Sequence, residues 1–278
     1  MISRSILAKI YKPREKWSHK GNFGKLLVVG GSIEYSGSPA FNAIAAYRSG
    51  VDLVHVVAPE ETTEIIGGFM PDMIVNRLEG DYLSIGHVKE ILEMQKKFDA
   101  MVIGGGLSRR KETFAAVNRI LSKTRIPCVI DADAIHAVAK NKKILKKNFV
   151  LTPHAHEFFI LSGTKPRNDI DDRKGIVRKL ASDLSCTVLL KGHVDVISDG
   201  KLTEENKTGN PFMTKGGFGD TLAGICGALL ARASAFDAAC AAAYINGAAG
   251  DLAAKKFGEG VMASDLLDKI PDVIKSHK

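Results

Sequence analysis

The chain has 278 residues, of which 45% are hydrophobic and 25% charged, and this composition excludes intrinsic disorder because a globular chain of this length buries a substantial core. Its 39 Lys and Arg residues exceed its 31 Asp and Glu residues, and the net charge of +8 suits an anionic small molecule. Nucleic acid is not expected as a partner, because no segment interleaves basic with aromatic side chains.

Apolar runs of strand length alternate with segments of helical spacing. The apolar runs are rich in Val, Ile and Leu, which is typical of strands covered on both faces. They comprise residues 25–30, 51–57, 100–104, 127–131, 149–152 and 187–191. The helical segments comprise residues 39–50, 85–98, 111–124, 133–141, 153–163 and 169–184. This alternation predicts an α/β fold with a mostly parallel central sheet and helices on both faces.

The pattern changes after residue 191. Residues 193–198 and 201–203 flank Asp199-Gly200, a pair that predicts a type I′ turn and hence a hairpin at the edge of the sheet. Two Ala-rich helices are expected at 220–233 and 237–256, and a short one near 264–270. Because the sequence has no repeat, no linker rich in Pro, Gly or Ser and no shift in composition, we expect residues 1–278 to form a single domain.

Several features indicate the compartment. The most apolar region, 221–254, is interrupted by three charged residues and is too broken to span a bilayer. The first eleven residues lack the apolar core of an export signal. The four cysteines have no metal-ligand spacing and read as buried thiols of a reducing compartment; they are Cys128, Cys186, Cys226 and Cys240. We therefore expect a soluble, cytoplasmic protein with no membrane contact, and we expect it to be a homo-oligomer.

The sharpest motif is the segment 209–220, GNPFMTKGGFGD, which leads into a helix expected to begin at Asp220. Gly216, Gly217 and Gly219 let the backbone turn its N–H groups inward at the helix N-terminus, where the helix dipole favours a phosphate. The carboxylate of Asp220 would then take the proton of a hydroxyl that attacks phosphorus. The alternative is an ordinary Gly-rich loop in which Asp220 is the helix N-cap.

Other loops follow strands at the edge where an open α/β sheet binds ligands. None matches the G-x-G-x-x-G fingerprint, because Arg109 holds the place of its last glycine, and there is no G-x-x-x-x-G-K-[ST]. Hydride transfer on a Rossmann fold and P-loop hydrolysis therefore lose their main support. The loops are Gly30-Gly31-Ser32, Gly104-Gly105-Gly106, Asp131-Ala132-Asp133, Thr152-Pro153-His154 and Lys191-Gly192.

Polar residues in these loops leave alternatives open. His154, His156 and Glu157 do not form a zinc motif, but Glu157 could help to hold a hydrated Mg²⁺ near phosphates, or could only complement the helix dipole. Asp133 could be the N-cap of the next helix while Asp131 bonds loop amides. Lys191 could meet phosphate or reach solvent.

Taken together, these segments resemble the family of ADP- or ATP-dependent NAD(P)H-hydrate dehydratases, and the resemblance covers the chain from about His19 to Pro271. The resemblance implies a ribokinase-like three-layer sandwich. It also implies an enzyme that repairs hydrated NADH and NADPH, with ADP or ATP phosphorylating the 6-hydroxyl, phosphate then leaving, and Mg²⁺ assisting. The matching segments are HKGNFG (19–24), VGGS (29–32) with Tyr35 and Gly37, AYRSG (46–50), DADA (131–134), LTPH (151–154) with Glu157, LKG (190–192) and 209–220.

The resemblance also implies roles for individual residues. Asp220 matches the catalytic base, and the amides of Gly216, Gly217 and Gly219 match the anion hole. The segment Lys191, Gly192, His193, Val194 and Asp195, with Gly219, matches the nucleotide site, and Ser38, Pro39, Gly106 and His154 match positions that face the hydrate. The chain departs from the family at Gly105, His156, Lys215 and Phe218.

Many members of the family carry an N-terminal epimerase domain. Only about eighteen residues precede the first motif here, so we do not expect the chain to epimerise the hydrate. Two other functions remain open. One is a kinase of a thiazole- or pyridoxine-type alcohol, which needs the same loop and base, and the other is a nucleotide-binding protein without catalysis.

Overall fold

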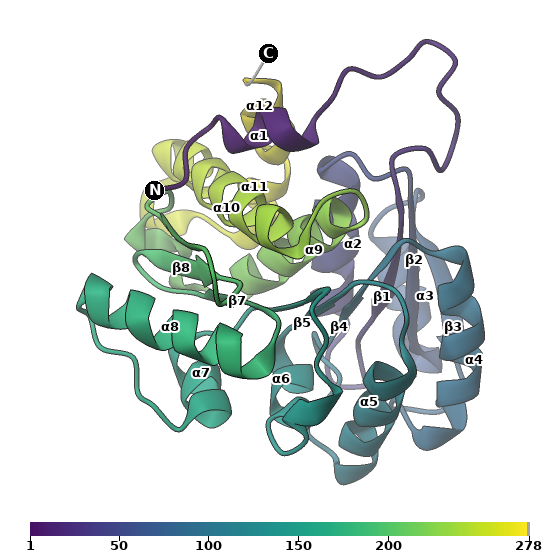
Figure 1. The fold of residues 1–278 in the computed structure, drawn as a ribbon. Coiled ribbons are helices and arrows are strands. Elements are labelled where there is room, and N and C mark those ends of the chain that lie inside the picture. Colours follow the sequence, from purple (N-terminus) through teal and green to yellow (C-terminus); the bar gives the residue numbers. More distant parts are fainter. Residues whose placement is uncertain (277–278) are drawn as a thin grey trace.

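One nine-stranded sheet organises the computed structural model, which describes residues 1–276 (Figure 1). The strand order is β3-β2-β1-β4-β5-β6-β7-β8-β9, with β1 to β7 parallel and β8 and β9 antiparallel at one edge. The strands are β1 Lys25–Val29, β2 Leu53–Pro59, β3 Ile74–Leu78, β4 Ala100–Ile103, β5 Cys128–Ile130, β6 Phe149–Leu151, β7 Thr187–Leu190, β8 Asp195–Ser198 and β9 Thr203–Asn206.

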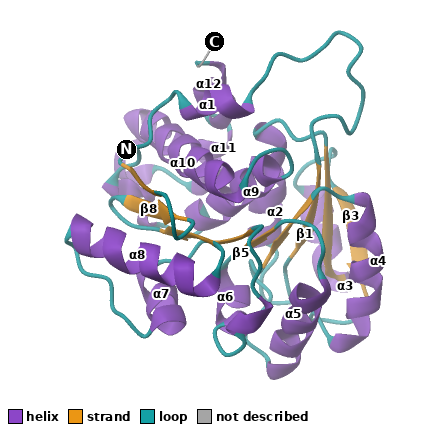
Figure 2. Ribbon diagram, in the orientation of Figure 1, coloured by secondary structure: helices purple, strands orange, loops and turns teal. Residues whose placement is uncertain are grey.

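Helices cover both faces of this sheet (Figure 2). Successive residues of a strand face opposite layers: in β1, Leu26 and Val28 belong to one core, and Leu27 and Val29 to the other. The first core includes residues of α1 Ile6–Ile10, α2 Gly37–Arg48, α3 Glu60–Gly68, α9 Phe218–Leu230, α10 Ala235–Phe257, α11 Ala263–Leu267 and α12 Ile270–Lys275. The second includes residues of α4 Val88–Met94, α5 Lys111–Lys123, α6 Ala132–Val138, α7 Ala155–Ser162 and α8 Ile170–Leu184. The expected three-layer α/β sandwich is confirmed.

Among the α-helices and strands, the sequence missed four: α1, α3, α12 and β3. β3 lies at the edge of the sheet, and of its five residues only Leu78 is buried, so it lacks the apolar run that marks the covered strands. α1 has five residues, too few to show a helical period. No helix within residues 1–276 is long and apolar enough to cross a membrane.

The hairpin lies at the sheet edge as expected, but the predicted type I′ turn is wrong. A type I′ turn needs a positive φ at both central residues, and of Asp199 and Gly200 only Gly200 has one, at +91°. A longer loop connects β8 to β9 instead. The Asp199 Oδ1 atom accepts the backbone N–H groups of Lys201 at 2.8 Å and Leu202 at 2.7 Å.

The sheet order places the loop after β1 beside the loop after β4. The chain winds outward from β1 to β2 and β3 on one side and from β4 onward on the other, so the topological switch point lies between β1 and β4. There the N–H group of Gly31 donates to the carbonyl oxygen of Gly105 at 2.9 Å. Open α/β sheets bind ligands at such a crevice.

Candidate active site

The Gly-rich loop ends at the N-terminus of α9, which begins at Phe218, not at Asp220. Its N-cap is Gly217, whose φ is +97°, and a Cβ there would lie 2.7 Å from the Cβ of Ala263. A glycine is therefore required at this position. Asp220 lies inside the first turn, so its interpretation as an N-cap is wrong.

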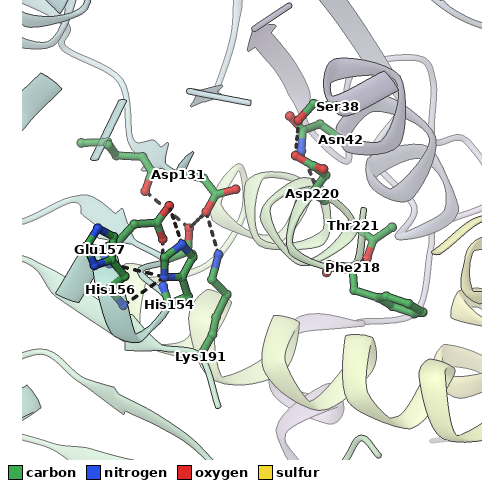
Figure 3. A network of polar contacts seen from close by, with 12 residues as sticks. Ser38, Asn42, Asp131, His154, His156, Glu157, Lys191, Phe218, Asp220 and Thr221 are labelled. Carbon is green, nitrogen blue, oxygen red and sulfur yellow. Dashed lines mark hydrogen bonds and ion pairs between the residues drawn. The ribbon is translucent and has the colours of Figure 1, made fainter. Parts of the chain in front are cut away.

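The side chain of Asp220 is tied to α2. Its Oδ1 accepts a hydrogen bond from the Ser38 hydroxyl, and its backbone oxygen accepts one from the Asn42 amide at 2.7 Å (Figure 3). Burial, with a smaller contribution from Asp131, raises the pKa of Asp220 from 3.8 to about 6. A carboxylate of this pKa is a stronger base than an ordinary aspartate and is still mostly ionised at neutral pH.

Lys191 follows β7 and pairs with Asp131, which follows β5. The Lys191 Nζ atom lies 3.1 Å from Asp131 Oδ1, which also accepts the Thr152 hydroxyl at 2.7 Å. Burial disfavours the ammonium form, but the neighbouring carboxylates, Asp131 first among them, outweigh it and raise the pKa of Lys191. A Cβ at Gly219 would lie 3.4 Å from Nζ, so this ammonium stands beside the start of α9.

His154 and Glu157 form a capping box at the start of α7. The Nδ1 atom of His154 accepts from the backbone N–H groups of His156 and Glu157, at 3.1 and 3.3 Å, and Glu157 Oε2 accepts from the His154 N–H at 2.8 Å. Partial burial and Lys191 lower the pKa of His154, which favours the neutral ring. Burial raises the pKa of Glu157 to about 7.

Two cavities meet at the start of α9. The first, of about 690 Å³, has Phe218 and Gly219 in its wall, and the second, of about 710 Å³, has Gly217 and Asp220. The first is lined by His154, Lys191, Gly192, His193, Asp195, Thr208, Gly209, Asn210, Pro211, Met213, Thr214, Phe218, Gly219, Leu222, Asn246 and Gly247. The second is lined by Glu34, Tyr35, Gly37, Ser38, Phe41, Gly106, Ser108, Arg109, Ala132, Asp133, Gly217 and Asp220.

The structure distributes the predicted site residues between these cavities. Ser38, Gly106 and Asp220 line the second cavity, whereas His154 lines the first, beside Lys191. Pro39 is buried, and a Cβ at Gly30 would lie 3.3 Å from its Cβ. Asp195 accepts the N–H of Gly192 at 3.0 Å and so fixes the loop after β7. Val194 and Gly216 are not among the lining residues of either cavity.

No pattern in the sequence indicates that Arg109 and Asp133 pair. Asp133 Oδ1 accepts from Arg109 Nε at 3.0 Å, and its Oδ2 accepts the N–H of Ser108 at 3.0 Å. The interpretation of Asp133 as a helix N-cap is therefore wrong, because Asp131 holds that position. Ser108 and Ala132 have left-handed φ angles of +74° and +47°. Such a conformation costs a non-glycine residue about 1–3 kcal/mol, whereas an exposed ion pair contributes about 0–1 kcal/mol.

Comparison with known proteins identifies the family. A family model described as NAD(P)H-hydrate dehydratase matches residues 26–272. The chain belongs to this family. The ADP-dependent (S)-NAD(P)H-hydrate dehydratase of Cenarchaeum symbiosum is 39% identical over 284 residues, which cover 99% of this chain and 96% of that protein.

Other relatives of the NAD(P)H-hydrate dehydratase family are longer. The bifunctional NAD(P)H-hydrate repair enzyme of Pyrobaculum aerophilum is 41% identical over 263 residues, which cover 94% of this chain and 52% of that protein. The chain thus spans about half the length of several curated relatives that it matches.

Solved structures share this fold. An ADP/ATP-dependent NAD(P)H-hydrate dehydratase from Bacillus subtilis, co-crystallised with ATP/Mg²⁺, superposes with a TM-score of 0.83 at 26% identity and covers 99% of this chain and 98% of that one. A ribokinase-like superfamily protein from Enterococcus faecalis has a TM-score of 0.87 at 24% identity and covers 99% and 95%. The expected ribokinase-like fold is confirmed.

Proposed function

We propose that this protein is a nucleotide-dependent NAD(P)H-hydrate dehydratase. The observation that carries the proposal is the start of α9, where Phe218 and Gly219 line one cavity and Asp220 lines the adjoining one. The first N–H groups of a helix have no partner within the helix and are available to a phosphate. A phosphate held at the amides and a hydroxyl held at the carboxylate would lie next to each other. The family and the name of the Cenarchaeum relative favour ADP as the phosphoryl donor, with ATP as the alternative.

The reaction has two steps. First, Asp220 takes the proton of the 6-hydroxyl as its oxygen attacks the terminal phosphorus, and AMP or ADP leaves. Second, the lone pair of the ring nitrogen expels phosphate from C6, and loss of a proton from C5 restores the double bond of NAD(P)H. The amides of Gly216, Gly217 and Gly219 would stabilise charge on the transferred group, and Lys191 would add a cation beside them.

We assign the nucleotide to the first cavity and the hydrate to the second. The first cavity contains Lys191 with its raised pKa, and Gly192, His193 and Asp195 of the loop that also carries Val194 line it together with Gly219. The second cavity contains Asp220, Ser38 and Gly106. Pro39, which is buried next to Ser38, would support the second cavity, and His154, which lines the first cavity beside Lys191, would contact a part of the hydrate that extends past the start of α9.

Glu157 is suited to bind a hydrated Mg²⁺ together with the nucleotide phosphates. Within residues 1–276 no group of three or more His, Cys, Asp or Glu side chains could hold a metal ion. Mg²⁺, however, often keeps several waters and binds through one carboxylate together with substrate phosphates. Glu157 is buried with a pKa raised to about 7, so a nearby cation would relieve the cost of ionising it. When bound, Mg²⁺ would neutralise charge on the nucleotide phosphates.

Hydrated NADH incubated with Mg²⁺ and either ADP or ATP tests the proposal. We expect one inorganic phosphate released and one nucleotide consumed for each NADH whose absorbance returns. An alcohol kinase would instead accumulate a stable phosphomonoester from a thiazole- or pyridoxine-type alcohol, because an ordinary alcohol has no ring nitrogen to expel phosphate. Absence of NADH recovery with both nucleotides would exclude the dehydratase.

We also propose that residues 1–278 act as one cytoplasmic domain in a homo-oligomer, although 277 and 278 lie outside the described residues. All described strands belong to one sheet, which supports a single domain. The four cysteines are buried free thiols, which suits a reducing compartment. Trp17 is 95% exposed, which suits contact with a second copy. Light scattering coupled to gel filtration measures the oligomeric state, and a mass of one chain would exclude the oligomer.

A further inference from the structure

We propose that Arg109, held in place by Asp133, binds a phosphate group of the hydrated dinucleotide. This inference rests on the proposed function and extends it to the part of the substrate that does not react. The ligand chemistry is a phosphate ester, which has two sources in the substrate. The pyrophosphate occurs in both NADH and NADPH, and the 2′-phosphate only in NADPH.

The charged residues that line the second cavity are acidic except for one cation. Arg109 is the single cation among the described residues that line the second cavity, whereas Glu34, Asp133 and Asp220 are all acidic. A dinucleotide is an anion, so a cavity with this lining would repel it unless one group offset its charge. Arg109 is the lining residue that can do so.

The guanidinium of Arg109 has unused hydrogen-bond donors. The hydrogen bond to Asp133 uses Nε of Arg109, and within residues 1–276 this guanidinium makes no other hydrogen bond. Its two Nη groups are therefore available as a fork, the geometry that matches two oxygens of one phosphate. The side chain is 62% exposed, so a ligand can reach it.

The backbone next to both Arg109 and Asp133 is strained. Ser108 and Ala132 adopt left-handed conformations, and each directly precedes one member of the pair. Asp133 also accepts the N–H of Ser108, so it fixes the backbone that carries Arg109 as well as the guanidinium. The free energy that an exposed ion pair contributes is smaller than the cost of two left-handed residues. Such strain is typical of residues that position a group for a ligand.

Arg109→Gln tests the inference, with Arg110→Gln as the matched control. Arg110 is adjacent and carries the same charge, but it lies over the Tyr82 ring, 4.2 Å from the centroid, and is not in the cavity lining. We expect Arg109→Gln to raise KM for the hydrate about 10- to 100-fold with kcat and KM for ADP within a few-fold. Arg109→Lys should be intermediate. A rise in KM for both hydrates assigns the pyrophosphate, and a rise for NADPH hydrate alone assigns the 2′-phosphate.

A binding measurement separates this inference from the proposed function. Calorimetry with NADH and NADPH reports the phosphate contact without turnover, and we expect weaker binding in Arg109→Gln than in wild type and Arg110→Gln. If the wild type lacks dehydratase activity but Arg109→Gln still weakens binding, the proposed function fails and the phosphate contact stands. If the wild type is active and the Arg109→Gln variant has unchanged KM and binding, the inference is overturned; a lower Tm alone would make the ion pair purely structural.

Discussion

At the scale of the residue, Asp220 is a group whose surroundings oppose its ionised form. Burial and Asp131 raise its pKa to about 6, and the hydrogen bond from Ser38 and the charge of Lys191 limit that rise. The result is a carboxylate that is deprotonated at neutral pH and still basic enough to accept a hydroxyl proton. Because the pKa of Asp220 is higher in the folded than in the unfolded state, ionising it lowers the free energy of unfolding. This loss accumulates as pH rises from about 4 and is complete above about 6.

Asp220→Asn should lower kcat by about 10²–10⁴, because the amide keeps the shape of the carboxylate but cannot take the proton. Affinity for ADP should stay within a few-fold, since Asp220 lines the other cavity. Because removing a buried charge of raised pKa does not destabilise the folded state, Tm at pH 8 should not fall below that of the wild type. Steady-state kinetics and thermal melts measure both quantities, and near-normal kcat would refute Asp220 as the base.

Ser38→Ala should shift the acid limb of the pH–rate profile to higher pH. A base works when deprotonated, so kcat/KM of the wild type should fall as pH drops through about 6. The hydrogen bond from Ser38 lowers the pKa of Asp220, and its removal raises that pKa. Profiles between about pH 5 and 9 measure the limb, and a shift toward lower pH would contradict the assignment.

At the scale of the element, α9 depends on glycines that serve different purposes. Gly217 has a positive φ and no space for a Cβ, so it is required by the fold. Gly219 has no such φ, and the nearest atom to its Cβ would be Nζ of Lys191. Gly224 packs where a Cβ would overlap the backbone of Asn42 in α2. The start of α9 is therefore fixed by packing as well as by its loop.

Gly219→Val should fold and yet lose nucleotide affinity. A side chain here requires no left-handed backbone, but it would enter the first cavity beside Lys191. Gly217→Ala should weaken binding and also lower Tm, because its Cβ meets Ala263 at 2.7 Å. Calorimetry with ADP distinguishes them. A folded Gly219→Val variant with wild-type affinity would show that the nucleotide phosphates bind elsewhere.

Gly224→Ala and Gly175→Ala should change stability in opposite directions. Gly175 lies in α8 with nothing within 4 Å of its Cβ position, so alanine should stabilise the helix by about 0.5–1 kcal/mol. At Gly224 the Cβ would lie 2.7 Å from Asn42 Cα, and overpacking should cost about 1–3 kcal/mol. Denaturant unfolding measures both, and equal effects would refute close packing of α9 on α2.

At the scale of the whole molecule, the two cavities are present together and share the start of α9 as a wall. The residues of this wall come from the start of one helix. The rest of the first lining includes the loops after β6, β7 and β9 and part of α10, and the rest of the second includes the loops after β1 and β4 and the starts of α2 and α6. The two linings share no residue, so we expect the nucleotide to bind in the first cavity without the hydrate.

ADP alone should therefore stabilise the protein. At a concentration of 100 times its Kd, a ligand adds about 2.7 kcal/mol, which corresponds to a rise in Tm of roughly 5–10 °C for a chain of this size. Asp220→Asn should show the same rise and Gly219→Val should not. Thermal melts with and without ADP measure it, and no shift without the hydrate would mean that the nucleotide cavity forms only in the ternary complex.

The sequence by itself determined the sandwich and the principal motif. Covered parallel strands need apolar side chains on both faces, so β1, β2 and β4 to β7 appear as nearly continuous apolar runs. The glycines before the apolar helix α9 predict a turn at its start. The edge strand β3 needs no such run and left no signal. The apolar runs also show which loops follow the covered strands, and hence which edge of the sheet carries the site.

Only the tertiary structure decided which of those loop residues pair. Arg109 meets Asp133 across 24 positions of sequence because β4 and β5 are neighbours, and Lys191 meets Asp131 across 60 because β6 alone separates β5 from β7. The pKa of Asp220 likewise depends on burial between α2 and α9. Local sequence sets backbone angles and apolar faces, whereas a charge responds to neighbours that the order of the strands brings near, and that order is a property of the folded sheet.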